Sequence, residues 1–220
     1  MKDTKRNIKE QRIIEATERV FSKVGFVNAK MEDIAADAGI TKVTLYSYFK
    51  SKENLQLAVT HKALLLLIDK YYSHLSSNKS KSGLDSTIGI FKLFIEFCEQ
   101  NFLYSEALLN YFALIRSTAQ GSNKEKLTEG INESLYFRKI QDIQNLPFKL
   151  TVQEIERGKK DGTIRSDIDP MLATLAAWSA SIGYIKVVAA SGKNIKPLFN
   201  VDKESLKKLQ LKTASDLLKK

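Results

Sequence analysis

The feature that most constrains the fold of this chain is a pair of short helical patterns separated by one glycine. The first pattern, residues 34–38, ends at Gly39, and the second begins behind Thr41 and runs to Phe49. Glycine commonly ends helices because it adopts left-handed backbone angles without steric cost, and threonine is a favoured N-cap residue. Two helices joined by so short a turn must pack across each other, which predicts a helix-turn-helix unit.

The apolar residues of this segment share one face of the pair. Leu45 and Phe49 are four positions apart, and Ile34 and Ile40 are placed to meet them. Ala35 is small enough to let the two helices approach closely. We therefore expect these residues to be buried and the opposite side of residues 42–49 to be exposed.

That exposed side has an unusual composition for a solvated surface. Such surfaces are usually rich in glutamate and lysine, whereas residues 42–49 contain no acidic residue that would repel phosphates. Val43 and the methyl group of Thr44 suit contacts with thymine methyl groups, and Lys42 suits base edges or phosphates. The pattern favours a helix that lies in a groove of DNA.

Two tyrosines of the same segment allow a second interpretation. Tyr46 and Tyr48 could simply pack the three-helix unit instead of contacting DNA. This alternative is stronger for Tyr48, which lies three residues from Leu45 and so near the apolar face.

Basic residues flank the helix pair on both sides. Lys52 lies at the predicted start of the next helix, where it can meet the DNA backbone. A basic arm is expected ahead of the first helix, formed by Lys5, Arg6, Lys9 and Arg12. The formal net charge of +10 over 220 residues likewise suits a polyanionic partner, either nucleic acid or an anionic membrane surface.

Helical spacing of apolar residues continues along nearly the whole chain, which has only three prolines. It predicts an all-α fold of nine or ten helices. The first is expected to close at Gly25, and a long fourth helix is expected from Lys52 to about Leu75. Later helices are expected over residues 85–102, 105–119, 124–144, 147 to 158 or 162, 171–191 and 202–220.

The helix expected over residues 171–191 is apolar nearly all round, and such a helix must be covered on all sides. Its small residues, which include Ala180 and Gly183, would let another helix approach closely. Together with the final helix, 202–220, it predicts a homodimer with a four-helix interface around residues 170–191 and 202–220. The alternative is a monomer that buries this helix in its own core.

From about Lys9 to Leu57 the chain resembles the TetR family of bacterial transcriptional regulators. The matching stretches are IIEATERVFSKVGF, MEDIAADAGI and TKVTLYSYFKSKENL. The resemblance implies a three-helix helix-turn-helix DNA-binding domain at residues 1–60 and a C-terminal ligand-sensing and dimerisation bundle at residues 61–220. By the same resemblance, DNA contacts are expected from Lys42, Thr44, Tyr46, Ser47, Tyr48 and Lys52.

Two departures from the family pattern adjust that set of contacts. Val43 stands where the family often has glycine or alanine, which could change the base preference. Ala29 and Lys30 replace hydroxyl residues that cap the second helix and touch phosphate, so Lys30 or Asn28 is expected to substitute. Lys30, Val43 and the capping Thr41 therefore complete the candidate DNA-binding set.

The central helices are dense in aromatic residues. Any one of them is most simply a core residue, but together they suit an apolar ligand pocket inside a helical bundle. The candidate ligand-binding residues are Tyr71, Phe94, Tyr111, Phe112, Arg116 and Trp178. Arg116 follows Phe112 by four positions, so it could orient a ligand, or it could be a surface or salt-bridge residue. The family resemblance implies that a small molecule bound there separates the two DNA-binding domains.

Catalysis, cofactors and metal ions are not expected. His61 and His74 lie thirteen positions apart without partners at ligand spacing, and no phosphate-binding glycine loop or nucleophile motif is present. Cys98 is the only cysteine, which excludes a disulfide framework and favours a reducing cytosol. The longest apolar run, Ala63 to Ile68, is too short to cross a bilayer, so we expect a cytoplasmic protein without a membrane partner.

The sequence thus predicts a homodimeric transcriptional regulator, most simply a repressor. It would bind a palindromic operator in double-stranded DNA and be released by a small apolar or amphipathic ligand. The alternative is a ligand-independent architectural or nucleoid-associated DNA-binding protein. A continuous internal cavity would favour the first function, and a solidly filled bundle would favour the second.

Overall fold

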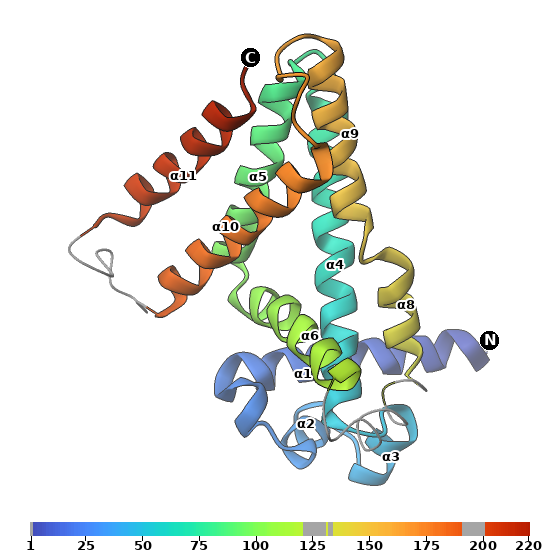
Figure 1. Cartoon of the computed structure of the whole chain (residues 1–220). Coiled ribbons are helices and arrows are strands. Elements are labelled where there is room, and N and C mark those ends of the chain that lie inside the picture. The colour runs from blue at the N-terminus through green and yellow to red at the C-terminus, as the bar shows by residue number, and fades with distance from the viewer. Residues whose placement is uncertain (1, 121–130, 132–133, 191–200) are drawn as a thin grey trace. The chain divides into compact units, whose positions relative to one another are not determined.

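The computed structural model of the chain is helical throughout the part that it describes, which is residues 2–120, 131, 134–190 and 201–220 (Figure 1). Side chains are described for the same residues except 2–4, 112 and 114–120. The helices are α1 (Lys2–Asn28), α2 (Met31–Asp37), α3 (Lys42–Tyr48), α4 (Lys52–Ser77), α5 (Gly83–Gln100), α6 (Phe102–Gln120), α8 (Leu135–Ile143), α9 (Leu146–Lys160), α10 (Pro170–Ala190) and α11 (Lys203–Leu218). Within the described residues there is no β-strand, and the all-α prediction is confirmed.

By their internal contacts the helices fall into two compact units. The first unit comprises residues 1–65 and 101–144, and the second comprises residues 66–100 and 145–220. Helix α4 begins in the first unit and ends in the second. The first unit therefore joins α6 and α8 to the three N-terminal helices. The domain boundary predicted near residue 60 concerns which residues meet DNA, and it stays a prediction.

The core of the first unit includes the apolar face that the helix-turn-helix pattern predicted. Ile34 and Leu45 are fully buried, and Phe49 is 3% exposed. Ile13 and Phe21 of α1 are buried as well, and α1 contacts α2 while α2 contacts α3. The buried back of α3 therefore fixes which of its side chains face outward.

Helix α1 differs from expectation at its start and agrees with it at its end. Gly25 has a φ of 77°, which breaks the helix as predicted. The basic residues near the N-terminus do not form a separate arm, however, because α1 already begins at Lys2. Lys5, Lys9 and Arg12 lie three or four positions apart in a helix, so they form one exposed stripe along it.

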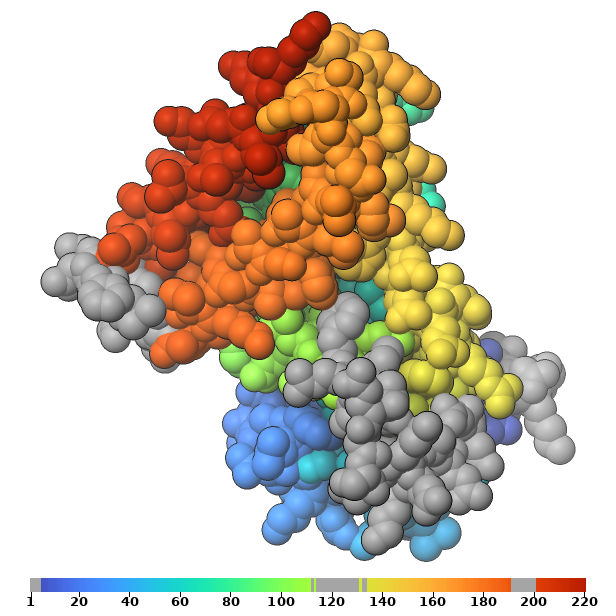
Figure 2. All heavy atoms as spheres, viewed as in Figure 1, coloured from blue at the N-terminus to red at the C-terminus, as the bar shows by residue number. Residues whose placement is uncertain are grey.

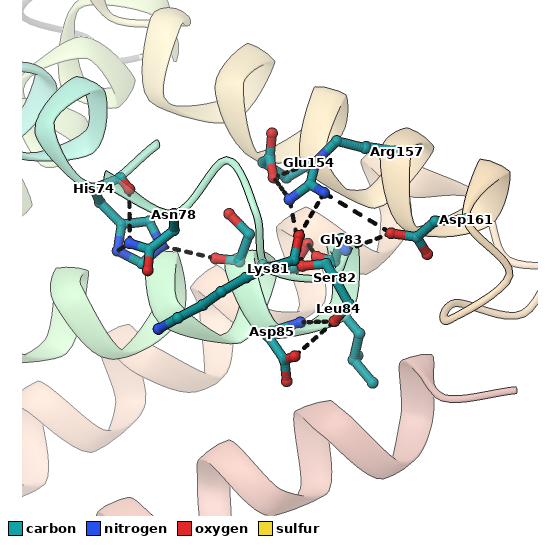
Figure 3. Close-up of polar contacts among 12 residues, drawn as sticks. His74, Asn78, Lys81, Ser82, Gly83, Leu84, Asp85, Glu154, Arg157 and Asp161 are labelled. Carbon is teal, nitrogen blue, oxygen red and sulfur yellow. Dashed lines mark hydrogen bonds and ion pairs between the residues drawn. The ribbon is translucent and has the colours of Figure 1, made fainter. Parts of the chain in front are cut away.

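In the second unit, α5 and α9 cross so closely that only glycine fits at the crossing. A Cβ atom on Gly83 would lie 2.1 Å from the backbone nitrogen of Gly158. Polar groups hold this crossing together (Figure 3). The Asp161 carboxylate accepts a hydrogen bond from the Gly83 N–H at 2.7 Å, and Arg157 donates to the Lys81 carbonyl oxygen at 2.8 Å.

The turn after α9 extends this contact to the last helix. The Arg165 N–H donates to the Leu218 carbonyl oxygen at 2.9 Å, beside an isolated β-bridge between Ile164 and Lys219. One apolar cluster then joins four helices and this turn: Phe91, Ile155, Ile164, Ala173 and Leu218. The second unit is therefore fixed at the ends of α5, α9 and α11.

Helix α10 carries an apolar surface that the second unit covers only in part. It is the one described helix long and apolar enough to cross a membrane, a test that a core helix of a soluble protein also passes. Its apolar residues form no long uninterrupted run, because Thr174, Ser179 and Ser181 lie among them. Only 28% of its most apolar 18-residue window is buried. The remaining residues are half-buried or exposed.

We expect Gly83→Ala to destabilise the second unit by about 3 kcal/mol, the upper end of the usual cost of overpacking, because the new methyl group would meet the backbone of α9. The matched control is Ser73→Ala in α4, an exposed helical position where helix propensity would rise. Urea denaturation followed by circular dichroism measures both. Equal midpoints for Gly83→Ala and wild type would contradict the close crossing.

Candidate DNA-binding interface

Helix α3 is placed by the short turn that precedes it. Gly39 has a φ of 65°, which turns the chain sharply after α2. The Thr41 hydroxyl then accepts a hydrogen bond from the Thr44 N–H at 3.2 Å and lies 2.9 Å from the Thr44 hydroxyl. Thr41 is therefore the N-cap, as predicted, and its side chain is directed at the helix backbone.

The outward side of α3 forms a surface that we name the reading face: Lys42, Val43, Thr44, Tyr46, Ser47 and Tyr48. Val43 is 81% exposed and Tyr46 is 42% exposed. Lys42 and Ser47 are exposed as well, while Thr44 and Tyr48 are half-buried. The Val43 side chain is therefore almost entirely available to solvent or to another molecule.

A carboxylate from the neighbouring helix lies beside the reading face. Glu32 of α2 forms an ion pair with Lys42, whose ammonium group is also 5.9 Å from the centre of the Tyr46 ring. The hydrogen bond between them lowers the pKa of Glu32 and raises that of Lys42. The helix itself is free of acids, as its sequence shows, but the surface around it is not. Lys42 must leave Glu32 to bind a phosphate.

Tyr48 contacts α1 as well as its own helix. The guanidinium carbon of Arg6 lies 5.8 Å from the centre of the Tyr48 ring, within the range of a cation–π contact. The two interpretations left open for Tyr48 are therefore compatible, because its half-buried ring is packed and still reaches the surface. Arg6 extends the basic surface from α1 to the end of α3.

Lys52 and Lys30 lie near the end of α1 and the start of α2, and their contacts with DNA stay predictions. The Lys52 ammonium group donates to the Val27 carbonyl oxygen at 2.8 Å and lies 4.8 Å from the centre of the Phe26 ring, so in the absence of DNA it contacts the end of α1. Lys30 is the exposed N-cap residue of α2 and makes no side-chain capping bond. The Asn28 amide donates to the Val24 carbonyl oxygen at 3.1 Å.

A hollow of about 370 Å³ lies between the basic stripe of α1 and the turn before α3. It is lined by Lys5, Ile8, Lys9, Arg12, Ile13, Ala38, Gly39 and Ile40. Among the described residues no acidic side chain lines it. The basic stripe of α1 thus adjoins the turn that leads into the reading face.

The described candidate ligand-binding residues are divided between the two units. Tyr71 and Phe94 are buried in the second unit, and Tyr111 is buried in the first, where its hydroxyl donates to Gln144 Oε1 at 2.9 Å. Trp178 is half-buried and packs edge-to-face on Phe148. The side chains of the other two candidates, Phe112 and Arg116, lie outside the described residues.

The second unit has an apolar hollow elsewhere, between α10 and α11. Its volume is about 520 Å³, and Phe91 of α5 forms part of its floor. Figure 2 shows α10 and α11 on one face of the molecule, with part of α5 visible between them. Leu209 and Leu217 line the hollow yet are 60% and 50% exposed. None of the described ligand candidates lines it.

Metal chemistry has no support in the part of the chain that the structure describes, which holds no group of three His, Cys, Asp or Glu side chains placed for an ion. His61 is half-buried. Its burial is the larger cause that lowers the pKa of its imidazole, and the positive charge of Lys139 is the smaller one. His74 is engaged with Asn78 and with the Ser86 carbonyl oxygen at 3.1 Å (Figure 3). Both histidine side chains are therefore packed or hydrogen-bonded within the protein.

Comparison with known proteins agrees with the geometry of the first unit. Residues 13–59 match the model of the bacterial regulatory proteins of the tetR family. Over 76 residues the chain is 41% identical to an uncharacterized HTH-type transcriptional regulator, YerO, from Bacillus subtilis (strain 168). That alignment covers 34% of this chain and only 23% of YerO, so it concerns about a quarter of the relative.

Solved structures share the fold of the whole chain at low sequence identity. The ketosteroid transcriptional regulator KstR2 of Mycobacterium tuberculosis aligns over 96% of this chain and 95% of its own, with a TM-score of 0.65 and 19% identity. The regulator FadR from Bacillus subtilis, in complex with stearoyl-CoA, aligns over 94% and 98%, with a TM-score of 0.64 and 16% identity. These likenesses show the all-α fold of such regulators.

We expect Glu32→Gln to raise affinity for duplex DNA a few-fold and to steepen its salt dependence by about one ion, because Lys42 is then free to displace a counterion from phosphate. Asp69→Asn in α4 is the matched control, since it removes the same charge from an exposed position outside the reading face. Fluorescence anisotropy over a series of salt concentrations measures both. Identical salt slopes for the two variants would contradict the role given to the ion pair.

Proposed function

We propose that this chain, which belongs to the TetR family of bacterial regulatory proteins, is a homodimeric transcriptional repressor released from its operator by a small ligand. The observation that carries the proposal is the reading face: an exposed helix surface with one fully apolar side chain, hydroxyl groups and a lysine, on a helix without acids. Such a surface suits direct contact with base edges and methyl groups in the major groove. The basic stripe of α1, together with Arg6, suits contacts with the flanking phosphates.

Dimerisation is supported by the apolar surface of α10 and α11. Leucine side chains are exposed on both helices, and a hollow lies between them, so a second copy could insert its own apolar side chains there. A stable interface needs about 800 Å² from each partner, which two helices of this length can supply. A two-fold dimer would hold two reading faces about 34–36 Å apart, or a multiple of that distance, and would require a palindromic operator.

Release by an apolar or amphipathic ligand is supported by the neighbours and by composition. FadR of Bacillus subtilis holds stearoyl-CoA in a chain of the same fold, and the second unit here buries several aromatic side chains. A ligand acts only if it binds the DNA-incompetent state more tightly, by about 1.4 kcal/mol for each tenfold loss of operator affinity. We place the protein in the cytoplasm, where its DNA partner lies.

We expect Tyr46→Ala to lower operator affinity about tenfold, because its half-exposed ring leaves the reading face while the buried back of α3 is unchanged. Tyr72→Ala is the matched control: Tyr72 is a similarly exposed tyrosine, at 49%, in α4. Gel-shift titration with a selected operator measures affinity, and circular dichroism checks helicity. Wild-type affinity in Tyr46→Ala, or an equal loss in Tyr72→Ala, would reject the reading face.

We expect the double variant Leu209→Glu, Leu217→Glu to be monomeric at micromolar concentration, because two carboxylates would be buried without partners at the proposed interface. Leu135→Glu in α8 is the control, since this leucine is equally exposed, at 57%, but lies outside α10 and α11. Sedimentation equilibrium gives the mass of each. A dimer in the double variant would place the interface elsewhere.

A further inference from the structure

One tyrosine of α8 contacts three other helical elements of the first unit. The Tyr136 ring stacks on Phe49 with 6.0 Å between centroids and 21° between planes, and it meets the His61 ring at 5.6 Å. Its hydroxyl donates to Glu10 Oε1 of α1 at 2.6 Å. The side chain is 7% exposed, so these contacts replace solvent almost completely.

The contact with Phe49 matters most, because Phe49 ends α3, the helix that carries the reading face. It is the C-cap residue of α3, with extended backbone angles, and its N–H donates to the Leu45 carbonyl oxygen at 2.9 Å. Its ring is 3% exposed. The preceding residue is Tyr48 of the reading face, so the seat of the Phe49 ring determines where that face ends and how it is oriented.

The surroundings of Tyr136 hold its ring in place. The Lys139 ammonium group lies 4.8 Å from the ring centre, and the end of α8 is tied to α6 by the hydrogen bond from Tyr111 to Gln144. Burial and the bond to Glu10 raise the pKa of the Tyr136 hydroxyl, which therefore keeps its proton as the donor at neutral pH.

We infer that Tyr136 is a positioning residue that sets the orientation of the reading face through Phe49. The inference rests on the proposed function, in which α3 meets DNA. Helix α8 ends at Ile143 and α9 of the second unit begins at Leu146, so α8 is one of the places where the chain passes between units. A shift of α8 that unseats the Tyr136 ring releases Phe49 and weakens operator binding.

The test compares Tyr136→Leu, Tyr136→Phe, Phe49→Leu and the double variant Phe49→Leu, Tyr136→Leu in operator titrations. We expect about tenfold weaker binding for Tyr136→Leu and less than about twofold for Tyr136→Phe, which keeps the stacked ring. The double variant should bind about as well as the weaker single variant, because residues that act through one contact are not additive. Additive losses of affinity in the double variant, or equal losses in Tyr136→Phe and Tyr136→Leu, would overturn the inference.

Tyr104→Leu is the matched control. Tyr104 of α6 also donates to a carboxylate of α1, Glu18 Oε1 at 3.0 Å, so its removal costs the first unit a comparable side chain. At a temperature where every variant is folded and dimeric, we expect Tyr104→Leu to keep operator affinity within about twofold of wild type. A tenfold loss in this control would show a general effect of stability and would overturn the specific role of Tyr136.

Hydrogen exchange without DNA separates this inference from the proposed function. In Tyr136→Leu, the Leu45 and Phe49 amides should exchange about tenfold faster, while the Ile34 amide of α2 stays as in wild type. If wild type binds no selected duplex but the α3 amides respond, the proposed function fails and the positioning role stands. If the α3 amides keep wild-type exchange rates, the positioning role fails, whatever the protein binds.

Discussion

The structure depends on the burial of one side of a very short helix. Helix α3 has seven residues, too few to be stable alone in water. It exists because Leu45 is fully buried where α3 meets α2, because Gly39 turns the chain between the two helices, and because Thr41 caps the first turn. Once the back is buried, the remaining side chains have only one direction to face. The orientation of the reading face is therefore fixed by the core behind α3 and by the helices that surround it.

The same reasoning applies to the second unit, on a larger surface. Its core is closed at the glycine crossing of α5 and α9 and by the cluster around Ile164, which fixes the ends of α9 and α11. Helix α10 is apolar on more sides than this core can cover, and α11 leaves a hollow beside it. We propose that one unit offers a surface for DNA and the other a surface for a second copy. A palindromic site would link the two, since the symmetry of a two-fold dimer would set the spacing of its half-sites.

Local sequence patterns predicted the features of the fold that residues close together in sequence determine. The break at Gly25, the cap at Thr41 and the start of α11 behind Asp202 all follow from residues within a few positions. Partners far apart in sequence could not be found this way. The Glu32–Lys42 pair, the Arg6–Tyr48 contact and the stack of Tyr136 on Phe49 arise from packing between elements, and a single sequence carries no local signal for them. The hydrogen bond from the Lys52 ammonium group to the Val27 carbonyl oxygen is a further contact of this kind. Aromatic density likewise could not separate core residues from pocket residues, and the apolar hollow is lined by other residues than the described candidates.

The proposed function requires that the acid-free side of α3 recognises a specific sequence in duplex DNA. Selection of bound duplexes from a random library, followed by sequencing, measures this recognition. We expect enrichment of one palindromic motif whose half-sites are about one helical turn, or a multiple, apart. A library that stays random after repeated rounds, at a salt concentration where the protein is folded and dimeric, would contradict it.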